Sequence, residues 1–205
     1  MLKRAFEISA LLLLVACTSA PMKMADVKEG NWKARALIKD KDHSHTYIVN
    51  LDFNAIQNEN LRVDVSSTLG QQVASLVVTN KEVRYFTTDN KKFYTGSPRP
   101  ETLRPILAIP LDPRWLQNIL FDVPPTAAGW KCQNDADGFV SDCKYPSTNL
   151  SITWSNRKGP NKTVDISHPR AEIQLNIRSF TTKIEKTDHL FDLQAPEGYQ
   201  ALRLR

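Results

Sequence analysis

The chain has 205 residues, of which 41% are hydrophobic, and its lysines and arginines exceed its acidic residues by five. This length is enough for one ordinary domain with a real core and does not call for two. The mild positive charge favours anionic lipid headgroups, but no run of basic residues forms the patch typical of nucleic-acid-binding proteins. We therefore expect no nucleic-acid partner.

Residues 1–16 have the organisation of a secretory signal peptide. Lys3 and Arg4 form a short basic start, and a mainly apolar stretch then runs to Ala16. This stretch is far shorter than the roughly 20 residues that a membrane-spanning helix needs. Its ending, Leu14-Val15-Ala16-Cys17, resembles the lipobox of bacterial lipoproteins. The alternative is an ordinary signal peptide followed by a chance cysteine.

The lipobox implies cleavage before Cys17 and attachment of lipid, including palmitate, to that cysteine. Each buried CH₂ group of such an anchor contributes about 0.8 kcal/mol, so more than one chain is needed for stable anchoring. Thr18 stands where an aspartate would resemble an inner-membrane retention signal. The resemblance therefore predicts anchoring at the periplasmic face of the outer membrane.

Residues 17–30 are polar and include Pro21, which is typical of a flexible tether, so we expect the folded domain to span 31–205. With Cys17 used by the anchor, Cys132 and Cys143 remain. In an oxidising periplasm this pair is expected to form a disulfide. The alternative is a metal site, but no histidine lies near either cysteine in the sequence.

Strands are predicted through most of the first half of the domain. Apolar and polar residues alternate from Tyr47 to Phe53, and again at Leu61, Val63 and Val65. A period of two is typical of a half-buried antiparallel strand. Further strands are expected at 71–79, 83–87 and 92–95, with turns at 80–81 and 89–90. The result is a meander of about six strands.

Two helices are predicted next, because apolar residues recur at helical spacing over 103–109 and over 115–120. Asp112 and Pro113 have the form of an N-cap and a first helical position. Strands then return at 138–145, 150–154, 163–166 and 171–183, with short pieces at 190–193 and 201–204. This order lacks βαβ alternation, so we predict an α+β fold: a curved antiparallel sheet, or half-open β-barrel, with helices covering its concave face.

Several motifs in this order resemble one known family. They are Lys33-Ala34-Arg35-Ala36, Leu61-Arg62-Val63-Asp64-Val65, the turn with Leu69-Gly70, the strand 73–78, Asn90-Lys91-Lys92-Phe93-Tyr94, and the pattern Pro-Leu-x-x-x-Trp-Leu-x-x-Ile-Leu over 110–120. Residues 32–125 resemble the LolA/LolB lipoprotein-localisation family, more closely its outer-membrane receptor branch than its periplasmic carrier branch. The ending 191–198 is similar to the final strand of the carrier branch, whereas Cys132, Cys143 and the tail after Asp188 depart from the receptor pattern.

The resemblance implies a hydrophobic cavity for the acyl chains of a lipoprotein cargo, with helices as its lid. It implies a LolA-like periplasmic carrier and outer-membrane lipid as partners, a monomer, and no cofactor. Candidate lining residues are Val49, Leu51, Phe53, Val63, Val65, Leu76, Val78, Leu107, Trp115 and Leu116.

Leu69 corresponds in this resemblance to a receptor loop leucine that helps to insert cargo into the membrane. It is the only large apolar residue of its loop, so a tight turn is expected to push it into solvent or lipid. The alternative is a turn leucine that folds back onto the rim of the barrel.

Enzymatic activity is not expected from this sequence. His43 and His45 are placed to share one face of a strand, but no carboxylate or third histidine suggests a metal site with them. No Gly-x-Ser-x-Gly elbow and no glycine-rich phosphate loop occurs. The rival to a lipid-binding protein is a structural or assembly lipoprotein of the envelope, with a filled core, that acts through contacts with other proteins.

Overall fold

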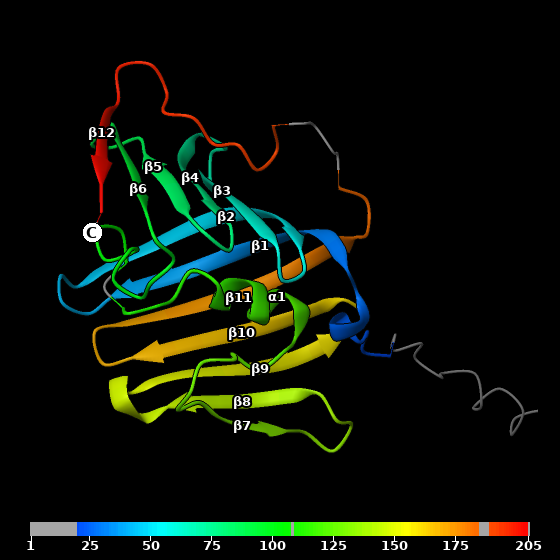
Figure 1. Ribbon diagram of the computed structural model, residues 1–205. Coiled ribbons are helices and arrows are strands. Elements are labelled where there is room, and N and C mark those ends of the chain that lie inside the picture. The colour runs from blue at the N-terminus through cyan, green and yellow to red at the C-terminus, as the bar shows by residue number, and fades with distance from the viewer. Residues whose placement is uncertain (1–19, 108, 185–188, 205) are drawn as a thin grey trace, which may run out of the picture.

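The computed structural model describes residues 20–107, 109–184 and 189–204, so the signal peptide and Cys17 lie outside the described residues. The described chain builds one twelve-stranded sheet that curves around the interior of the molecule (Figure 1). The strand order is β12-β6-β5-β4-β3-β2-β1-β11-β10-β9-β8-β7. In the described part of the chain β12 and β7 do not pair with each other, so the barrel is open.

The strands are antiparallel except for β12, which runs parallel to β6. Their bounds are β1 (Glu29–Asp40), β2 (His45–Ile56), β3 (Asn60–Ser67), β4 (Gln72–Val78), β5 (Val83–Thr87), β6 (Lys92–Gly96), β7 (Lys131–Asn134), β8 (Val140–Tyr145), β9 (Leu150–Lys158), β10 (Asn161–His168), β11 (Ala171–Thr181) and β12 (Gln200–Arg203). One α-helix, α1 (Trp115–Phe121), and two 3₁₀ turns, η1 (Met24–Asp26) and η2 (Pro146–Thr148), complete the elements of the described residues.

The strand register places apolar side chains on one face of the sheet. Trp32 of β1 pairs with Phe53, Phe53 with Val63, Val63 with Leu76, and Leu76 with Tyr85. A similar row crosses the other half of the sheet, because Ala36 pairs with Leu175, Leu175 with Val164, and Val164 with Trp154. Since side chains alternate along each strand, the polar residues between these positions lie on the outer face.

The predicted cover of helices is wrong, because α1 is the only α-helix in the described residues. Leu103 and Ile109 are buried as expected, but residues 97–107 form successive tight turns. The amides of Thr102, Arg104 and Ile106 each donate to the carbonyl three residues earlier. Pro105 and Pro110 lack the amide hydrogen that a continuing helix needs, which explains why helical spacing did not produce a helix here.

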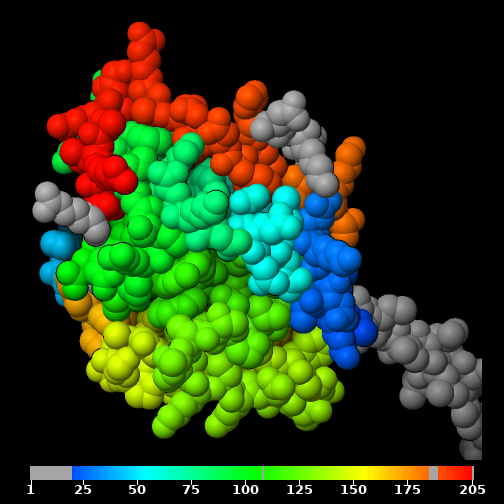
Figure 2. Space-filling model, viewed as in Figure 1, coloured from blue at the N-terminus to red at the C-terminus, as the bar shows by residue number. Residues whose placement is uncertain are grey.

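The segment 97–121, which we call the cover segment, lies against the inner face, with residue 108 outside the described residues. Figure 2 shows this green segment on one face of the molecule, above the yellow part of the chain. The predicted N-cap at Asp112 is wrong, because α1 begins at Trp115 and Arg114 is its N-cap. Asp112 Oδ1 accepts the amide hydrogen of Arg114 at 2.9 Å in the turn just before the helix. Ile119, Leu120 and Phe121 of α1 are buried against the sheet.

The predicted strand at 190–193 is also wrong. This part of the chain crosses the outer face of β4, β5 and β6, where Leu193 packs with Val77, Phe86 and Phe93. Tyr199 adds an edge contact to Phe86, with ring centroids 5.5 Å apart. Apolar residues on this part of the outer face are therefore covered by the C-terminal chain rather than exposed. The last predicted strand is present as β12.

The folded part of the chain begins before residue 31. Met24 in η1 is buried in the main core, and the amide of Met22 donates to the carbonyl of Gly159 at 2.8 Å. Residues that the sequence placed in the tether therefore pack against the domain, at the end of the sheet where β1 begins.

Cys132 and Cys143 lie directly opposite each other in β7 and β8 and are joined by a disulfide. This bond ties the edge strand β7 to a sheet that it contacts through only one neighbour. In the unfolded chain it closes a short loop, because the two cysteines are 11 residues apart.

We expect replacement of both Cys132 and Cys143 by alanine to lower the free energy of unfolding by about 2–3 kcal/mol, because the unfolded chain gains freedom. Urea denaturation with and without a reductant measures this effect. The unreplaced chain should lose the same stability on reduction, whereas the double variant should not respond. Equal stability of all these forms would contradict the structural role of the bond.

Candidate functional site

An apolar cavity of about 130 Å³ lies between the inner face of the sheet and the cover segment, and the side chains exposed in it present no polar surface. Most of the lining residues predicted from the sequence surround it: Val49, Leu51, Phe53, Val63, Val65, Leu76, Leu107 and Leu116. Strands β2, β3 and β4 supply the residues of the sheet, and the cover segment supplies the two leucines.

Two predicted lining residues lie elsewhere. Val78 faces inward, but it is two residues beyond Leu76 along β4 and borders a different, polar pocket. Trp115 turns toward the β7–β8 side of the sheet, where it makes edge contacts with Trp130 at 5.0 Å and Tyr145 at 5.8 Å. Its place in the helical stripe showed that it would be buried but not which neighbours it would meet.

The second half of the chain contributes lining residues that the sequence did not indicate. Ile166 of β10, with Ile173 and Leu175 of β11, closes the cavity opposite β3 and β4. Their alternation with polar residues marked them as inward-facing. Only the pairing of β1 with β11 shows that these strands face the same space as β2 and β3.

The cavity continues toward one end of the barrel through a wider hollow of about 370 Å³. The two spaces share Ile38, Val49 and Val65, and the hollow also reaches Tyr47 and Asp89. These last residues lie at the end where β1 stops and β2 starts, which we call the mouth. The other end, where β1 starts, we call the closed end. An apolar passage therefore leads inward from the mouth.

Ion pairs border the mouth where β1 ends and β11 begins. His43 and Asp40 are 2.8 Å apart, and this hydrogen bond lowers the pKa of Asp40 and raises that of His43. Lys41 contacts Glu172 at 2.9 Å across the β1–β11 pair. These polar residues form a rim between solvent and the apolar passage. His43 thus forms a surface pair with Asp40.

Leu69 is 87% exposed in the loop between β3 and β4, so it does not fold back onto the rim. The Ser67 hydroxyl accepts hydrogen bonds from the amides of Leu69 and Gln71, at 3.3 Å and 3.2 Å. Gly70 adopts a φ of 83°, which closes the turn in a conformation that other residues rarely take. Since β3 ends at Ser67, this leucine projects from the mouth end.

Two side chains of the sheet hold the cover segment in place. The Tyr85 hydroxyl donates to the carbonyl of Thr102 at 3.0 Å, and the Trp154 indole donates to the carbonyl of Ile119 at 3.4 Å. Burial raises the pKa of Tyr85, which keeps the hydroxyl protonated as a donor. The cover is thus attached on both sides of the cavity.

A buried charge cluster at the end of α1 was missed by sequence reasoning. Lys162 Nζ contacts Asp122 Oδ1 at 2.5 Å and the carbonyl of Leu120 at 2.7 Å, while Arg157 contacts Asp122 Oδ2 at 2.6 Å. Burial lowers the pKa of Lys162 to about 8, although the adjacent carboxylate favours its charged form. A signal was present, because Lys162 alternates in phase with Val164 and thus faces inward.

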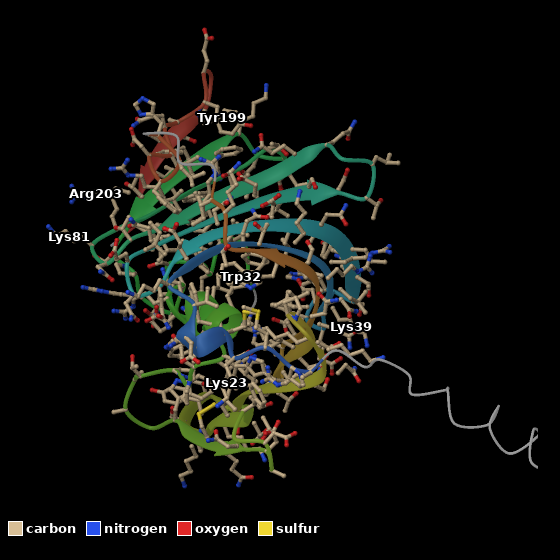
Figure 3. All side chains as sticks on the ribbon, turned by 90° about the vertical axis from the view of Figure 1, so that its right-hand side faces the viewer. Lys23, Trp32, Lys39, Lys81, Tyr199 and Arg203 are labelled. Atoms are coloured by element: carbon tan, nitrogen blue, oxygen red, sulfur yellow. A yellow bond between two sulfur atoms is a disulfide. The ribbon has the colours of Figure 1, made fainter. Side chains whose placement is uncertain are left out.

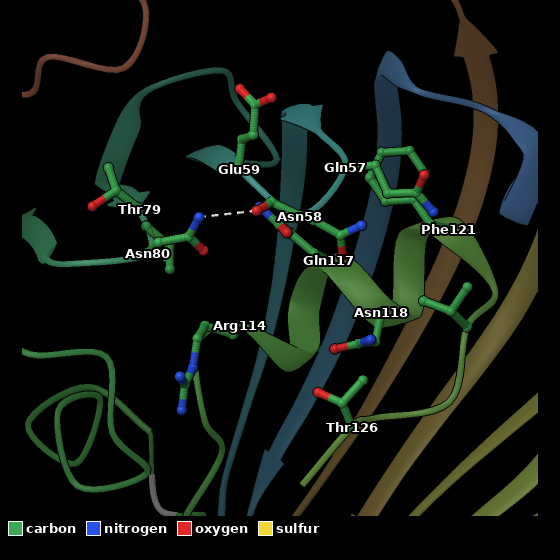
Figure 4. A pocket seen from close by; sticks show the side chains of 12 residues that line it. Gln57, Asn58, Glu59, Thr79, Asn80, Arg114, Gln117, Asn118, Phe121 and Thr126 are labelled. Carbon is green, nitrogen blue, oxygen red and sulfur yellow. Dashed lines mark hydrogen bonds between the residues drawn. The ribbon is translucent and has the colours of Figure 1, made fainter.

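The polar pocket at the closed end is separate from the apolar cavity. It has a volume of about 240 Å³ and lies between the β2–β3 turn, the β4–β5 turn and α1 (Figure 4). Asn80 donates to the carbonyl of Asn58 at 3.0 Å and ties the two turns together. Behind it, Trp32 packs edge-on against Phe121 with centroids 5.0 Å apart, which blocks the inner end of the barrel.

No family model and no curated protein matches the sequence. Among solved structures, a LolA superfamily protein from Nitrosomonas europaea superposes over 83% of this chain and 94% of its own, with a TM-score of 0.51 and 7% identity. The chain has the fold of that LolA superfamily protein. An uncharacterized conserved protein from Thermus thermophilus gives a TM-score of 0.38 at 10% identity, over 85% and 90% of the two chains. PNGF-II gives a TM-score of 0.31 at 9% identity, over 85% of this chain and 31% of its own.

The described residues contain no group of three or more histidine, cysteine or acidic side chains placed to hold a metal ion. Within the same residues, no helix has the length and apolar character required to cross a membrane.

The Lys162 cluster predicts a specific pH dependence of stability. Its pKa is about 8 in the folded protein and 10.5 for an ordinary lysine, so the folded state binds fewer protons between these values. Its contribution to the free energy of unfolding should therefore rise with pH across this window. Urea denaturation from pH 8 to pH 10 should show a steeper rise for the unreplaced chain than for Lys162→Met. The same pH dependence in both proteins would contradict this assignment.

Proposed function

We propose that this protein is a LolB-like receptor for lipoproteins, held by lipid on Cys17 at the periplasmic face of the outer membrane. It takes the acyl chains of a lipoprotein from a LolA-like periplasmic carrier into its cavity and helps to insert them into the membrane. It acts as a monomer, without catalysis and without a cofactor. The apolar cavity under the cover segment carries this proposal, and the fold shared with a LolA superfamily protein supports it.

The size of the cavity indicates how the cargo would enter. An apolar cavity of about 150 Å³ holds a molecule the size of benzene, so the 130 Å³ cavity takes only part of an acyl chain. Ile106 and Leu107 lie between this cavity and the mouth hollow, since both spaces are lined by these residues. Outward movement of these two side chains widens the connection between the spaces and makes a longer apolar channel.

Leu69 supports the insertion step. Its exposure is unusual for a large apolar side chain, and Tyr47 and Ile48 of the neighbouring strand β2, 50% and 43% exposed, lie at the same end of the sheet. Apolar groups that project from a polar rim are typical of contacts with another protein or a membrane. In this proposal Leu69 enters the bilayer and brings the mouth to its surface.

The second candidate function is that of a structural envelope lipoprotein. The packing of most of the inner face favours it, because residues such as Trp32, Phe53 and Leu61 are fully buried without any ligand. A protein of this kind would not exchange its core contacts for an acyl chain. Acyl binding therefore distinguishes the two functions.

We expect Val49→Trp to lower the affinity for a fluorescent palmitoylated peptide about tenfold or more, because the larger ring fills the passage between mouth and cavity. Ile48→Trp is the matched control, because Ile48 precedes Val49 on β2 and its side chain faces outward. Titration of each full-length protein with the peptide measures the affinity, and urea denaturation shows whether each variant is folded. Equal affinity of the two folded variants would exclude this cavity as the binding site.

We expect Leu69→Glu to bind the palmitoylated peptide normally but to lose transfer of an acylated lipoprotein to liposomes, because a carboxylate does not enter the bilayer. Thr68→Glu adds the same charge to the same loop and serves as the control. Transfer from the periplasmic carrier is followed by flotation of the liposomes. Unchanged transfer by Leu69→Glu would remove this residue from the mechanism.

A further inference from the structure

A basic hollow lies on the outer face of the sheet, away from the cavity. Lys33, Arg35 and Arg178 line it together with the polar Asn50 and Ser66, and its volume is about 290 Å³. Lys33 contacts Asp52 at 3.2 Å, whereas Arg35 and Arg178 make no ion pair with any residue that the structure describes. Two exposed guanidinium groups are thus free to bind an anion from solution.

Apolar side chains adjoin this hollow on the same face. Leu37 and Ile48 form the next outward pair along β1 and β2 after Arg35 and Asn50, and Ile48 is 43% exposed. Lys39 follows on β1 and contacts Glu172 of β11 at 3.4 Å. A surface of exposed cations beside apolar groups is complementary to the headgroup region of an anionic membrane.

The position of the anchor restricts how the domain can meet that membrane. The chain enters the fold at Met22, which is bonded to Gly159 at the closed end. Four residues lie between Cys17 and Met22, so the tether of five Cα–Cα steps reaches at most about 18 Å. Leu69 projects at the mouth end, which is separated from the closed end by the length of β1, about 40 Å for its 12 residues.

An upright barrel could therefore bring either the anchor or Leu69 to the bilayer, but not both. Both reach the same surface only if the barrel lies on its side. The basic outer face extends along β1 between the two ends, so it is the side whose charge suits a bilayer.

We propose that the outer face of β1, β2 and β11 docks on an anionic membrane surface and holds the barrel side-on, with Arg35 and Arg178 on lipid phosphates. This inference rests on the proposed anchoring at Cys17 and insertion by Leu69. The contact keeps the mouth at the headgroups, so that an acyl chain leaving the cavity does not cross water.

Vesicle binding by the chain from residue 17 onward, with Cys17→Ser to remove the lipid, tests the proposed docking face without the anchor. The protein is sedimented with phosphatidylcholine vesicles that contain increasing fractions of phosphatidylglycerol. We expect binding that grows with phosphatidylglycerol and weakens with salt. Arg35→Glu combined with Arg178→Glu should reduce it about tenfold or more, because two attractive charges become repulsive.

The control combines Lys81→Glu with Arg203→Glu, which change the net charge equally. Figure 3 shows these two residues on the side of the molecule opposite Lys39. Retained binding by this control and loss by the first pair is the expected result. Equal loss in both pairs, or binding that does not depend on phosphatidylglycerol, would overturn the side-on contact.

The same proteins are titrated with the palmitoylated peptide, so that the two proposals fail separately. Loss of vesicle binding with normal peptide affinity in the Arg35 and Arg178 variant is expected. Absence of peptide binding in the unreplaced chain would refute the receptor function, even if the vesicle contact is found. Normal peptide binding without any vesicle contact would refute only the side-on docking.

Discussion

Two rows of apolar side chains on the inner face of the sheet are the feature on which the other parts of the structure depend. One row passes from Tyr85 of β5 across the sheet to Trp32 of β1, and the other passes from Ala36 of β1 through β11 and β10 to Trp154 of β9. A shift of one residue in any strand would turn that strand's apolar residues to the outside. The register therefore creates both the surface that the cover segment buries and the cavity left between them.

The cover segment is held by side-chain contacts at the end of α1 and by fewer such contacts where it borders the cavity. The buried Lys162–Asp122–Arg157 cluster fixes the end of α1, since removing Asp122 would leave two cations in the interior without their counter-charge. By contrast, the turns around Ile106 are held mainly by short-range backbone hydrogen bonds. A cover held at Thr102 and at α1, with loosely held turns between these points, suits the proposed entry of a flexible chain from the mouth.

The sequence predicted the sheet well because alternation in strands such as β3 is a local property. It overestimated the helices because apolar spacing at Leu103 and Ile106 cannot show that Pro105 and Pro110 prevent a helix from forming. The lining from β2, β3 and β4 was predictable, whereas Ile173 required the pairing of β1 with β11, which joins strands more than a hundred residues apart. The C-terminal crossing could not be predicted, since Val77 and Phe86 gave no sign of which segment covers them.

The central claim is that the cavity under the cover segment holds an acyl chain. A peptide acylated with a chain that carries a diazirine near its far end tests this directly, because illumination links the chain end to the residues it touches. We expect cross-links to inner residues such as Leu51, Phe53 and Leu103, found by mass spectrometry of the digested protein. Cross-links confined to the outer face, or none above the level given by an unacylated peptide with the same diazirine, would contradict it.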